Sequence, residues 1–304
     1  MTTATKKTTL RVLLENLIDY AGLFPPARLD MAQTVRNYAE YVNGDDSWML
    51  GRLIVPAGRL DEFETEAREL LPKDGGTQPW RISALTKPAG DNELQANLQR
   101  IATFNEKHDS PKQGLARIDV IELKGESADE IDQALGLIPD DLFPFFELPV
   151  AEDPRGLITG LAGSEAGAKI RTGGVSADLH PSPEQVARFI VGCAQASVPF
   201  KATAGLHHPL RHFAKSVQTE QFGFLNVFTA AALAKALRLD ESDLRDVLTD
   251  QSIASFAFED DELQYREHHV DRDQLQEARW TFGISFGSCS FDEPREDLRT
   301  LNLI

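Results

Sequence analysis

Short segments rich in apolar residues alternate with amphipathic segments of helical period along the first two thirds of the chain. Strands that alternate with helices of about 10–15 residues are typical of βαβ units and a parallel sheet. The strands are predicted at residues 51–56, 80–86, 116–122, 143–149, 168–173 and 200–205. The helices between them are predicted at residues 31–42, 60–71, 92–106, 128–137, 155–163 and 183–196.

Two further segments bring the expected number of strands to eight. A helix predicted over residues 9–20 is followed by AGLFPP at 21–26, where the two prolines rule out a helix and permit a short first strand. The segment GISFGSCSF, residues 283–291, is the expected last strand. This pattern predicts an α/β protein with a (β/α)₈ TIM barrel, folded as a single domain over residues 1–304. An open doubly wound sheet is the alternative, but no Gly-rich phosphate loop follows the first strand.

The regular alternation ends near residue 205. Residues 206–282 are predicted to form an insertion of helices and a β-hairpin before the last strand. The elements expected within this insertion are helices at 224–237, 241–248 and 272–280 and a hairpin within 253–266. A closing helix is expected after the last strand, at 294–301.

Basic residues interrupt the apolar pattern of the strands. Strands of a parallel sheet that are covered on both faces normally read as continuous apolar runs, yet five of the six segments carry Arg or Lys at alternate positions. Because successive side chains of a strand point to opposite faces, these polar residues are expected to face the barrel interior. They are Arg52, Arg81, Ser83, Arg117, Asp119, Glu147, Lys169, Arg171, Lys201 and Thr203.

Six of these inward side chains are basic and two are acidic, although the whole chain has a formal net charge of −17. Removing a charged group from water without a partner costs on the order of several kcal/mol in a protein. A counter-charge for the excess basic groups is therefore expected. A small anionic metabolite with a phosphate or carboxylate group would supply it. The alternative is that ion pairs such as Arg117 with Asp119, or Glu147 with Lys169, simply fill a polar interior.

The remaining composition excludes several classes of partner. The acidic balance argues against nucleic acid, because a phosphate backbone requires an exposed basic surface. The first 20 residues lack the apolar core and cleavage site of a signal peptide, and no window approaches the roughly 18 apolar residues of a membrane span. Cys193 and Cys289 make neither a disulfide framework nor a zinc motif. A cytoplasmic protein is expected; homo-oligomers are common for such barrels, and the oligomeric state is left open.

Two strand segments place candidate substrate-binding groups at one end of the barrel. AKIRTGG ends with Gly173 and Gly174, and FKATAGLHHP contains Gly205 and His207. Active sites of these barrels lie at the carboxyl ends of the strands, and glycines there let backbone N–H groups approach an anion. The predicted substrate-binding residues are Arg52, Arg81, Arg117, Arg171, Thr172, Gly173, Thr203, Gly205, His207 and Asn226.

The predicted catalytic groups are the strand lysines. A lysine buried among other cations is expected to have a lowered pKa, which makes a neutral amine available to attack a carbonyl and form a Schiff base. Glu147 is placed to act as the general acid or base. No cofactor is required for this chemistry.

Lys169 followed by Thr172 and Gly173, and Lys201 opening K-A-x-x-G, resemble the sixth and seventh strands of class I aldolases of the deoxyribose-phosphate aldolase type. The resemblance covers about thirty residues. It implies that Lys169 forms the Schiff base, that Lys201 tunes it and relays protons, and that Asp119 assists from an earlier strand. Arg171 departs from the family pattern.

Several alternatives stay open at the level of sequence. A set of His207, His208 and Glu147 would suit Zn²⁺ or Fe²⁺, but the surrounding cations oppose a divalent metal, so no metal site is predicted. Cys289 is interpreted as a small core residue, since a nucleophilic thiol needs a neighbouring base. Asn226 would either cap a helix or reach the ligand. The alternative functions are a non-covalent transferase or decarboxylase and a non-catalytic anion-binding barrel.

Overall fold

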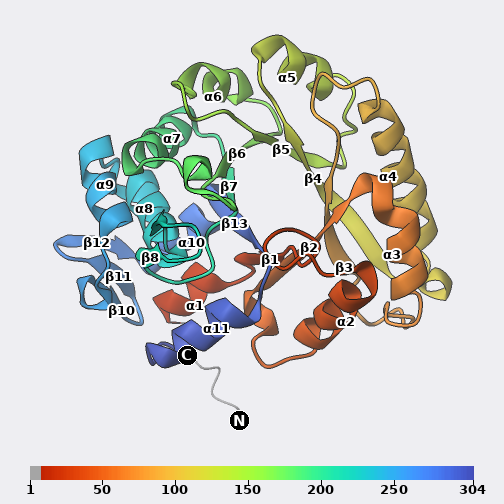
Figure 1. Ribbon diagram of the computed structural model, residues 1–304, viewed down its shortest axis with the longest axis horizontal. Helices are drawn as coiled ribbons and strands as arrows, with labels where there is room; N and C mark the ends of the chain where they lie inside the picture. The colour runs from red at the N-terminus through yellow and green to blue at the C-terminus, as the bar shows by residue number, and fades with distance from the viewer. Residues whose placement is uncertain (1–7) are drawn as a thin grey trace.

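Eight parallel strands close into a barrel in the computed structural model, which describes residues 8–304 (Figure 1). The strand order around the barrel is β1-β13-β7-β6-β5-β4-β3-β2. Figure 1 shows the helices ringing these strands. The predicted α/β TIM-barrel fold is therefore confirmed.

The barrel strands and the helices that follow them alternate along the chain as the sequence predicts. The strands are β1 (Ile18–Tyr20), β2 (Leu50–Pro56), β3 (Trp80–Leu85), β4 (Ala116–Lys124), β5 (Phe143–Glu147), β6 (Gly167–Arg171), β7 (Phe200–Thr203) and β13 (Gly283–Ser288). The helices are α2 (Met31–Val42), α3 (Leu60–Ala67), α4 (Leu94–His108), α5 (Ala128–Leu135), α6 (Arg155–Leu161), α7 (Pro183–Ala196), α8 (Phe224–Leu237) and α11 (Asp292–Thr300).

The start of the chain differs from the prediction. The first helix, α1 (Thr9–Leu14), is shorter than expected, and the first strand β1 lies within the segment predicted as helical. Tyr20 is followed by a turn at residues 22–27, so AGLFPP is a loop after the strand rather than the strand itself. The short segment IDY is buried at all three positions, and this hides any alternation of apolar and polar residues. The sequence reading of residues 1–7 lies outside the described residues.

The segment between β7 and β13 holds more than a barrel helix. It contains two small antiparallel sheets, β8 (His212–Ala214) with β9 (Thr219–Gln221), and β10 (Phe256–Phe258), β11 (Glu262–Tyr265) and β12 (His268–Asp271). The helices α9 (Glu241–Thr249) and α10 (Arg272–Thr281) also belong to it. The predicted hairpin within 253–266 corresponds to β10 and β11, while β8, β9 and β12 were not predicted.

A β-bulge in β4 changes which of its side chains face inward. Ile82 of β3 is opposite Ile118, but the next residue, Ser83, is opposite Val120, so Asp119 is skipped in the register. One extra residue on a strand reverses the alternation beyond it. As a result Glu122, at the end of the predicted strand, turns into the barrel, where it is 2% exposed and accepts a hydrogen bond from Ser83 Oγ.

Among residues 8–304, no helix combines the length and the apolar character needed to cross a membrane.

Candidate active site

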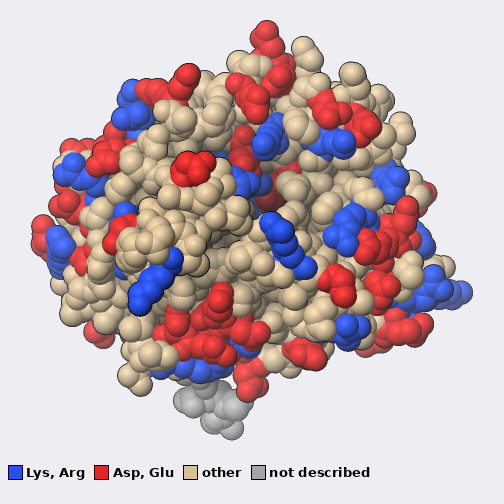
Figure 2. All heavy atoms as spheres, viewed as in Figure 1, with Lys and Arg blue, Asp and Glu red and all other residues tan. Residues whose placement is uncertain are grey.

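A cavity of about 890 Å³ lies at the carboxyl ends of the barrel strands. Strand residues such as Glu122, Glu147 and Lys169 form part of its wall. The loops after β1, β3, β6, β7 and β13 and the β8–β9 hairpin form the rest. Figure 2 shows a hollow near the centre of this face, beside basic side chains and a group of acidic ones over α11. The volume is suited to a small-molecule ligand.

A row of alternating acids and bases crosses the interior behind this cavity. Lys201 Nζ lies 2.6 Å from Asp19 Oδ2 and 2.6 Å from Glu122 Oε1. All three side chains are at most 2% exposed. Asp19 also accepts hydrogen bonds from the backbone N–H of Arg52 and from Ser285 Oγ. The buried ammonium of Lys201 is therefore neutralised on two sides.

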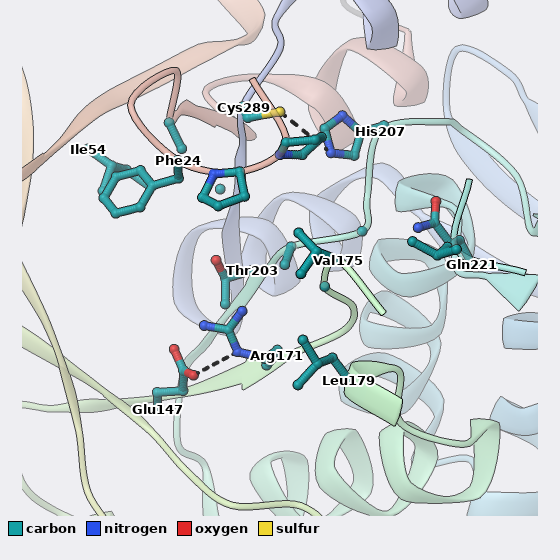
Figure 3. Close-up of a pocket in the computed structure, with 18 of the residues that line it drawn as sticks. Phe24, Ile54, Glu147, Arg171, Val175, Leu179, Thr203, His207, Gln221 and Cys289 are labelled. Atoms are coloured by element: carbon teal, nitrogen blue, oxygen red, sulfur yellow. Dashed lines mark hydrogen bonds and ion pairs between the residues drawn. The ribbon is translucent and has the colours of Figure 1, made fainter. Parts of the chain in front are cut away.

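The row continues through the second strand lysine to the cavity. Lys169 Nζ lies 2.9 Å from Glu122 Oε2 and 2.9 Å from Glu147 Oε2. Arg171 Nε donates to Glu147 Oε1 at 3.1 Å, and its side chain is 44% exposed. Figure 3 shows this Glu147–Arg171 pair at one side of the pocket, with Thr203 nearby. Three carboxylates and three bases thus alternate, and their formal charges sum to zero.

These contacts set the protonation of the groups. Burial raises the pKa of Glu122, but Lys169 and Lys201 outweigh it, so the pKa of this carboxyl lies well below its usual value. Burial also raises the pKa of Glu147, but the charges of Lys169 and Arg171 outweigh it, so the pKa of this carboxyl lies below its usual value. Burial would lower the pKa of Lys169, but Glu122 and Glu147 raise it above the ordinary value. The expectation that like charge lowers the pKa of this lysine is therefore wrong for the unliganded protein.

The two lysines differ in their access to the cavity. Lys169, Glu147 and Arg171 line it, whereas the side chain of Lys201 is enclosed between Asp19 and Glu122 and does not. Lys201 also lies 5.6 Å from the ring centre of Phe145. A substrate in the cavity would meet Lys169 first.

The basic residues predicted on β2, β3 and β4 pair with other carboxylates. Arg52 donates two hydrogen bonds of 2.7 Å to Asp119, and Arg81 lies 3.8 Å from the same carboxylate. Arg117 pairs with Asp141 at 2.7 Å. None of these five residues lines the cavity. The prediction of an excess of positive charge is therefore wrong. The structure pairs the basic residues with three carboxylates that the predicted set of inward-facing residues did not contain, those of Asp19, Glu122 and Asp141.

Asp119 pairs with Arg52 and Arg81, whereas Glu122, beyond the bulge, is the residue of β4 that contacts both Lys169 and Lys201. The assisting role that the aldolase resemblance implied for Asp119 stays a prediction.

The two glycine-containing turns meet at the cavity. Thr203 and Gly205 line it, and Gly173 packs directly against Gly205. Thr172 is fully buried, and its hydroxyl donates to the carbonyl oxygen of Ala204 at 2.5 Å. Thr172 and Gly173 therefore fix the turn after β7 rather than lining the cavity.

The side-chain amide of Asn226 makes its hydrogen bonds within the protein. It is fully buried near the start of α8, where its Nδ2 donates to the carbonyl oxygens of Val247 and Asp250. Its Oδ1 accepts from the backbone N–H of Arg211. The helix cap is Gly223 rather than Asn226, and Asn226 does not line the cavity.

The histidine and carboxylate set weighed as a metal site is not brought together. His207 Nδ1 lies 2.8 Å from Glu293, His208 Nδ1 lies 2.5 Å from Asp297, and Glu147 contacts Lys169 and Arg171. Over residues 8–304, no group of three or more His, Cys, Asp or Glu side chains is arranged to hold a metal ion. His207 does line the cavity, as predicted.

Sequence reasoning missed Asp19 and Glu122. Asp19 lies in a three-residue strand inside a segment with helical character. Glu122 had a detectable signal, because two adjacent apolar residues, Val120 and Ile121, break the alternation of ARIDVIELK where the bulge occurs.

Comparison of the chain with models of protein families, with curated proteins and with solved structures gives no match in any of the three.

Proposed function

We propose that the protein is a lyase of the aldolase type that forms a Schiff base between Lys169 and the carbonyl carbon of a small anionic substrate. One observation carries this proposal: Lys169 Nζ borders the cavity and is held within 2.9 Å of two carboxylates, those of Glu122 and Glu147. A nucleophilic lysine with adjacent groups that accept and return protons is the arrangement that imine chemistry needs.

The neutral amine arises by proton transfer within the row. Lys169 passes one proton to Glu147, which converts the ion pair into two neutral groups. The raised pKa of Lys169 and the lowered pKa of Glu147 oppose this transfer, so the attack on the carbonyl has to draw it forward. The amine then attacks the carbonyl carbon, and Glu147 returns the proton to the hydroxyl that leaves as water. The resulting iminium lies beside Glu122, whose carboxylate compensates its positive charge.

Carbon–carbon cleavage follows from the iminium. Glu147, again a carboxylate, takes the proton of the substrate hydroxyl on the carbon that will leave. The electron pair of the breaking carbon–carbon bond moves into the iminium and forms an enamine, while the other fragment leaves as a carbonyl compound. Glu147 then returns the proton to the enamine carbon, and hydrolysis by water releases the second product and the free lysine. Lys201 acts here as a positioning residue, because it holds Glu122 from the side remote from the cavity.

The anionic part of the substrate is assigned to Arg171 and the glycine turns. Arg171 is partly exposed and lines the cavity, so its guanidinium has donors free of Glu147 for a phosphate or carboxylate. The backbone of Gly174 and Gly205 lines the same wall. These groups favour a phosphorylated or carboxylated aldehyde or ketone.

Borohydride trapping tests the proposal. The protein is incubated with small keto acids, aldehyde acids and sugar phosphates, reduced, and mapped by peptide mass spectrometry. A reduced adduct is expected on Lys169 and is expected to be lost in Lys169→Arg, while Lys201→Arg keeps Lys169 as the labelled residue at a lower rate. Absence of an adduct on Lys169 with every compound would overturn the Schiff-base mechanism.

A second candidate function rests on the raised pKa of Lys169. A lysine held as a cation beside Arg171 would bind an anion without covalent chemistry, as in a transferase or decarboxylase. In that case Lys169→Arg would retain part of the activity, whereas a Schiff-base enzyme would lose all of it.

A further inference from the structure

A second group of reactive side chains lines the same cavity away from Lys169. Cys289 Sγ lies 3.8 Å from His207 Nε2, and His207 Nδ1 lies 2.8 Å from Glu293 Oε2. All three residues border the cavity. Figure 3 shows Cys289 and His207 at the side of the pocket opposite Glu147 and Arg171. A thiol, an imidazole and a carboxylate are therefore in the order nucleophile, base and orienting group.

These side chains come from the seventh and eighth barrel units, after the carboxyl ends of their strands. Cys289 follows β13 directly, His207 lies in the loop after β7, and Glu293 is in the first turn of α11. Hydrogen bonds fix the turn between β13 and α11: Ser290 N–H donates to Ser288 Oγ, and Glu293 N–H donates to Ser290 Oγ. The thiol and the carboxylate are thus held by one short, ordered segment.

The surroundings of the imidazole favour its protonated form. Burial lowers the pKa of His207, but Cys289 and Glu293 outweigh it and raise the pKa to about 9. Cys193, the other cysteine, is fully buried, and burial raises the pKa of its thiol well above the usual value. Of the two thiols, Cys289 borders the cavity and Cys193 does not.

We propose that Cys289, His207 and Glu293 form a nucleophilic triad that accepts the acyl group of a small ester or thioester. His207 takes the proton of the Cys289 thiol, and the sulfur attacks the acyl carbon to give a tetrahedral intermediate. When this collapses, the bond from the acyl carbon to the alcohol or thiol breaks, and His207 gives its proton to that leaving group. The product is a thioester on Cys289, which water hydrolyses with His207 as the base. Glu293 is a positioning residue that orients the imidazole.

This triad does not depend on the Schiff-base proposal. Its nucleophile, base and orienting residue are distinct from Lys169, Glu122 and Glu147, and its test uses a different reagent and a different labelled residue. Failure of borohydride trapping on Lys169 would leave the triad intact, and the reverse holds as well.

Acylation by p-nitrophenyl acetate tests the triad. The wild-type protein is expected to release p-nitrophenol and to carry an acetyl group on Cys289 in peptide mass maps, with Cys193 unmodified. His207→Gln is expected to slow acetylation of Cys289 by about 100-fold, the ordinary contribution of a general base. His208→Ala is the matched control, because its imidazole pairs with Asp297 rather than with Cys289. Acetyl groups on other residues only, or equal rates in wild type and His207→Gln, would overturn the proposal.

A second measurement needs no variant of the triad. The rate of iodoacetamide alkylation at Cys289 is followed between pH 5 and pH 9 in the wild-type protein. Other charged or titratable groups around the pair are Tyr20, Asp292 and His208 with its partner Asp297. Because the His207 imidazole lies 3.8 Å from the thiol, Cys289 is expected to react faster than the thiol of free glutathione measured under the same conditions. Alkylation of Cys289 that is no faster than that of glutathione at any pH in this range would contradict the triad.

Discussion

Lys201 Nζ lies 2.6 Å from Glu122 Oε1, and each of the two side chains is 2% exposed. This pair joins the two strand lysines, because the other oxygen of Glu122 contacts Lys169. This buried carboxylate shares the compensation of the two ammonium groups with Asp19 and Glu147, and its loss would leave part of their charge uncompensated. Glu122 therefore links the two halves of the buried acid–base row.

Replacing Glu122 by Gln is expected to lower the free energy of unfolding by about 3 kcal/mol, the order observed when one partner of a buried ion pair is removed. Each lysine would keep one carboxylate, Asp19 or Glu147, which limits the loss. Urea unfolding followed by circular dichroism measures the change. Glu69→Gln is the control, since its pair with Lys73 is on the surface and its removal should leave the midpoint unchanged. Equal midpoints for Glu122→Gln and wild type would contradict this account.

The same carboxylates make the fold sensitive to acid. The pKa values of Glu122, Glu147 and Asp119 are lower in the folded protein than their ordinary values, so their ionised forms stabilise the fold. This stabilisation is complete above the unfolded pKa of about 4.3 for Glu and 3.9 for Asp, and is lost as pH falls toward the folded pKa. The free energy of unfolding is expected to decrease between pH 5 and pH 3. The decrease should be smaller in Glu122→Gln, and an equal slope would show that Glu122 does not contribute.

Anion binding is expected to depend on Arg171. Inorganic phosphate should raise the melting temperature of the wild-type protein by mass action, and Arg171→Gln should weaken phosphate binding by about 10- to 100-fold, the loss of one charge-assisted hydrogen bond of about 1.5–3 kcal/mol. Arg117→Gln is the matched control, because Arg117 pairs with Asp141 and does not line the cavity. A phosphate-dependent shift that survives in Arg171→Gln would place the anion elsewhere.

The barrel could be predicted because its evidence is local. Six strands and most helices show the periods of two and 3.6 residues, so their bounds agree with the structure within a few residues. The same alternation predicted that the side chains of Lys169, Lys201 and Glu147 point into the barrel, where the structure has them. The first strand was missed because three consecutive buried residues, Ile18–Tyr20, have no period.

The charge balance of the interior could not be obtained in this way. Alternation assigns faces only while the register is unbroken, and the bulge at Asp119 reverses the assignment for Glu122. Cys289 is buried, as its interpretation as a core residue expects. Its contact with His207 could not be predicted, because His207 lies 82 positions away in sequence, in a loop with no periodic pattern. Contacts between loops of different barrel units depend on closure of the whole barrel.

The close contact between Gly173 and Gly205 provides a last prediction. A Cβ on Gly173 would lie 2.9 Å from Gly205 Cα, and Gly205 itself has φ +76°, so neither turn can move aside without strain. Gly173→Ala is expected to lower the free energy of unfolding by about 1–3 kcal/mol, the range for overpacked sites, and to weaken phosphate binding because Gly205 lines the cavity.

Gly156→Ala, in α6, is the control: nothing lies within 4 Å of its added Cβ, and alanine should stabilise this helix by about 0.5–1 kcal/mol. Urea unfolding and phosphate-dependent melting of both variants measure the two effects, and unchanged phosphate binding in a destabilised Gly173→Ala would separate the turn from the anion site.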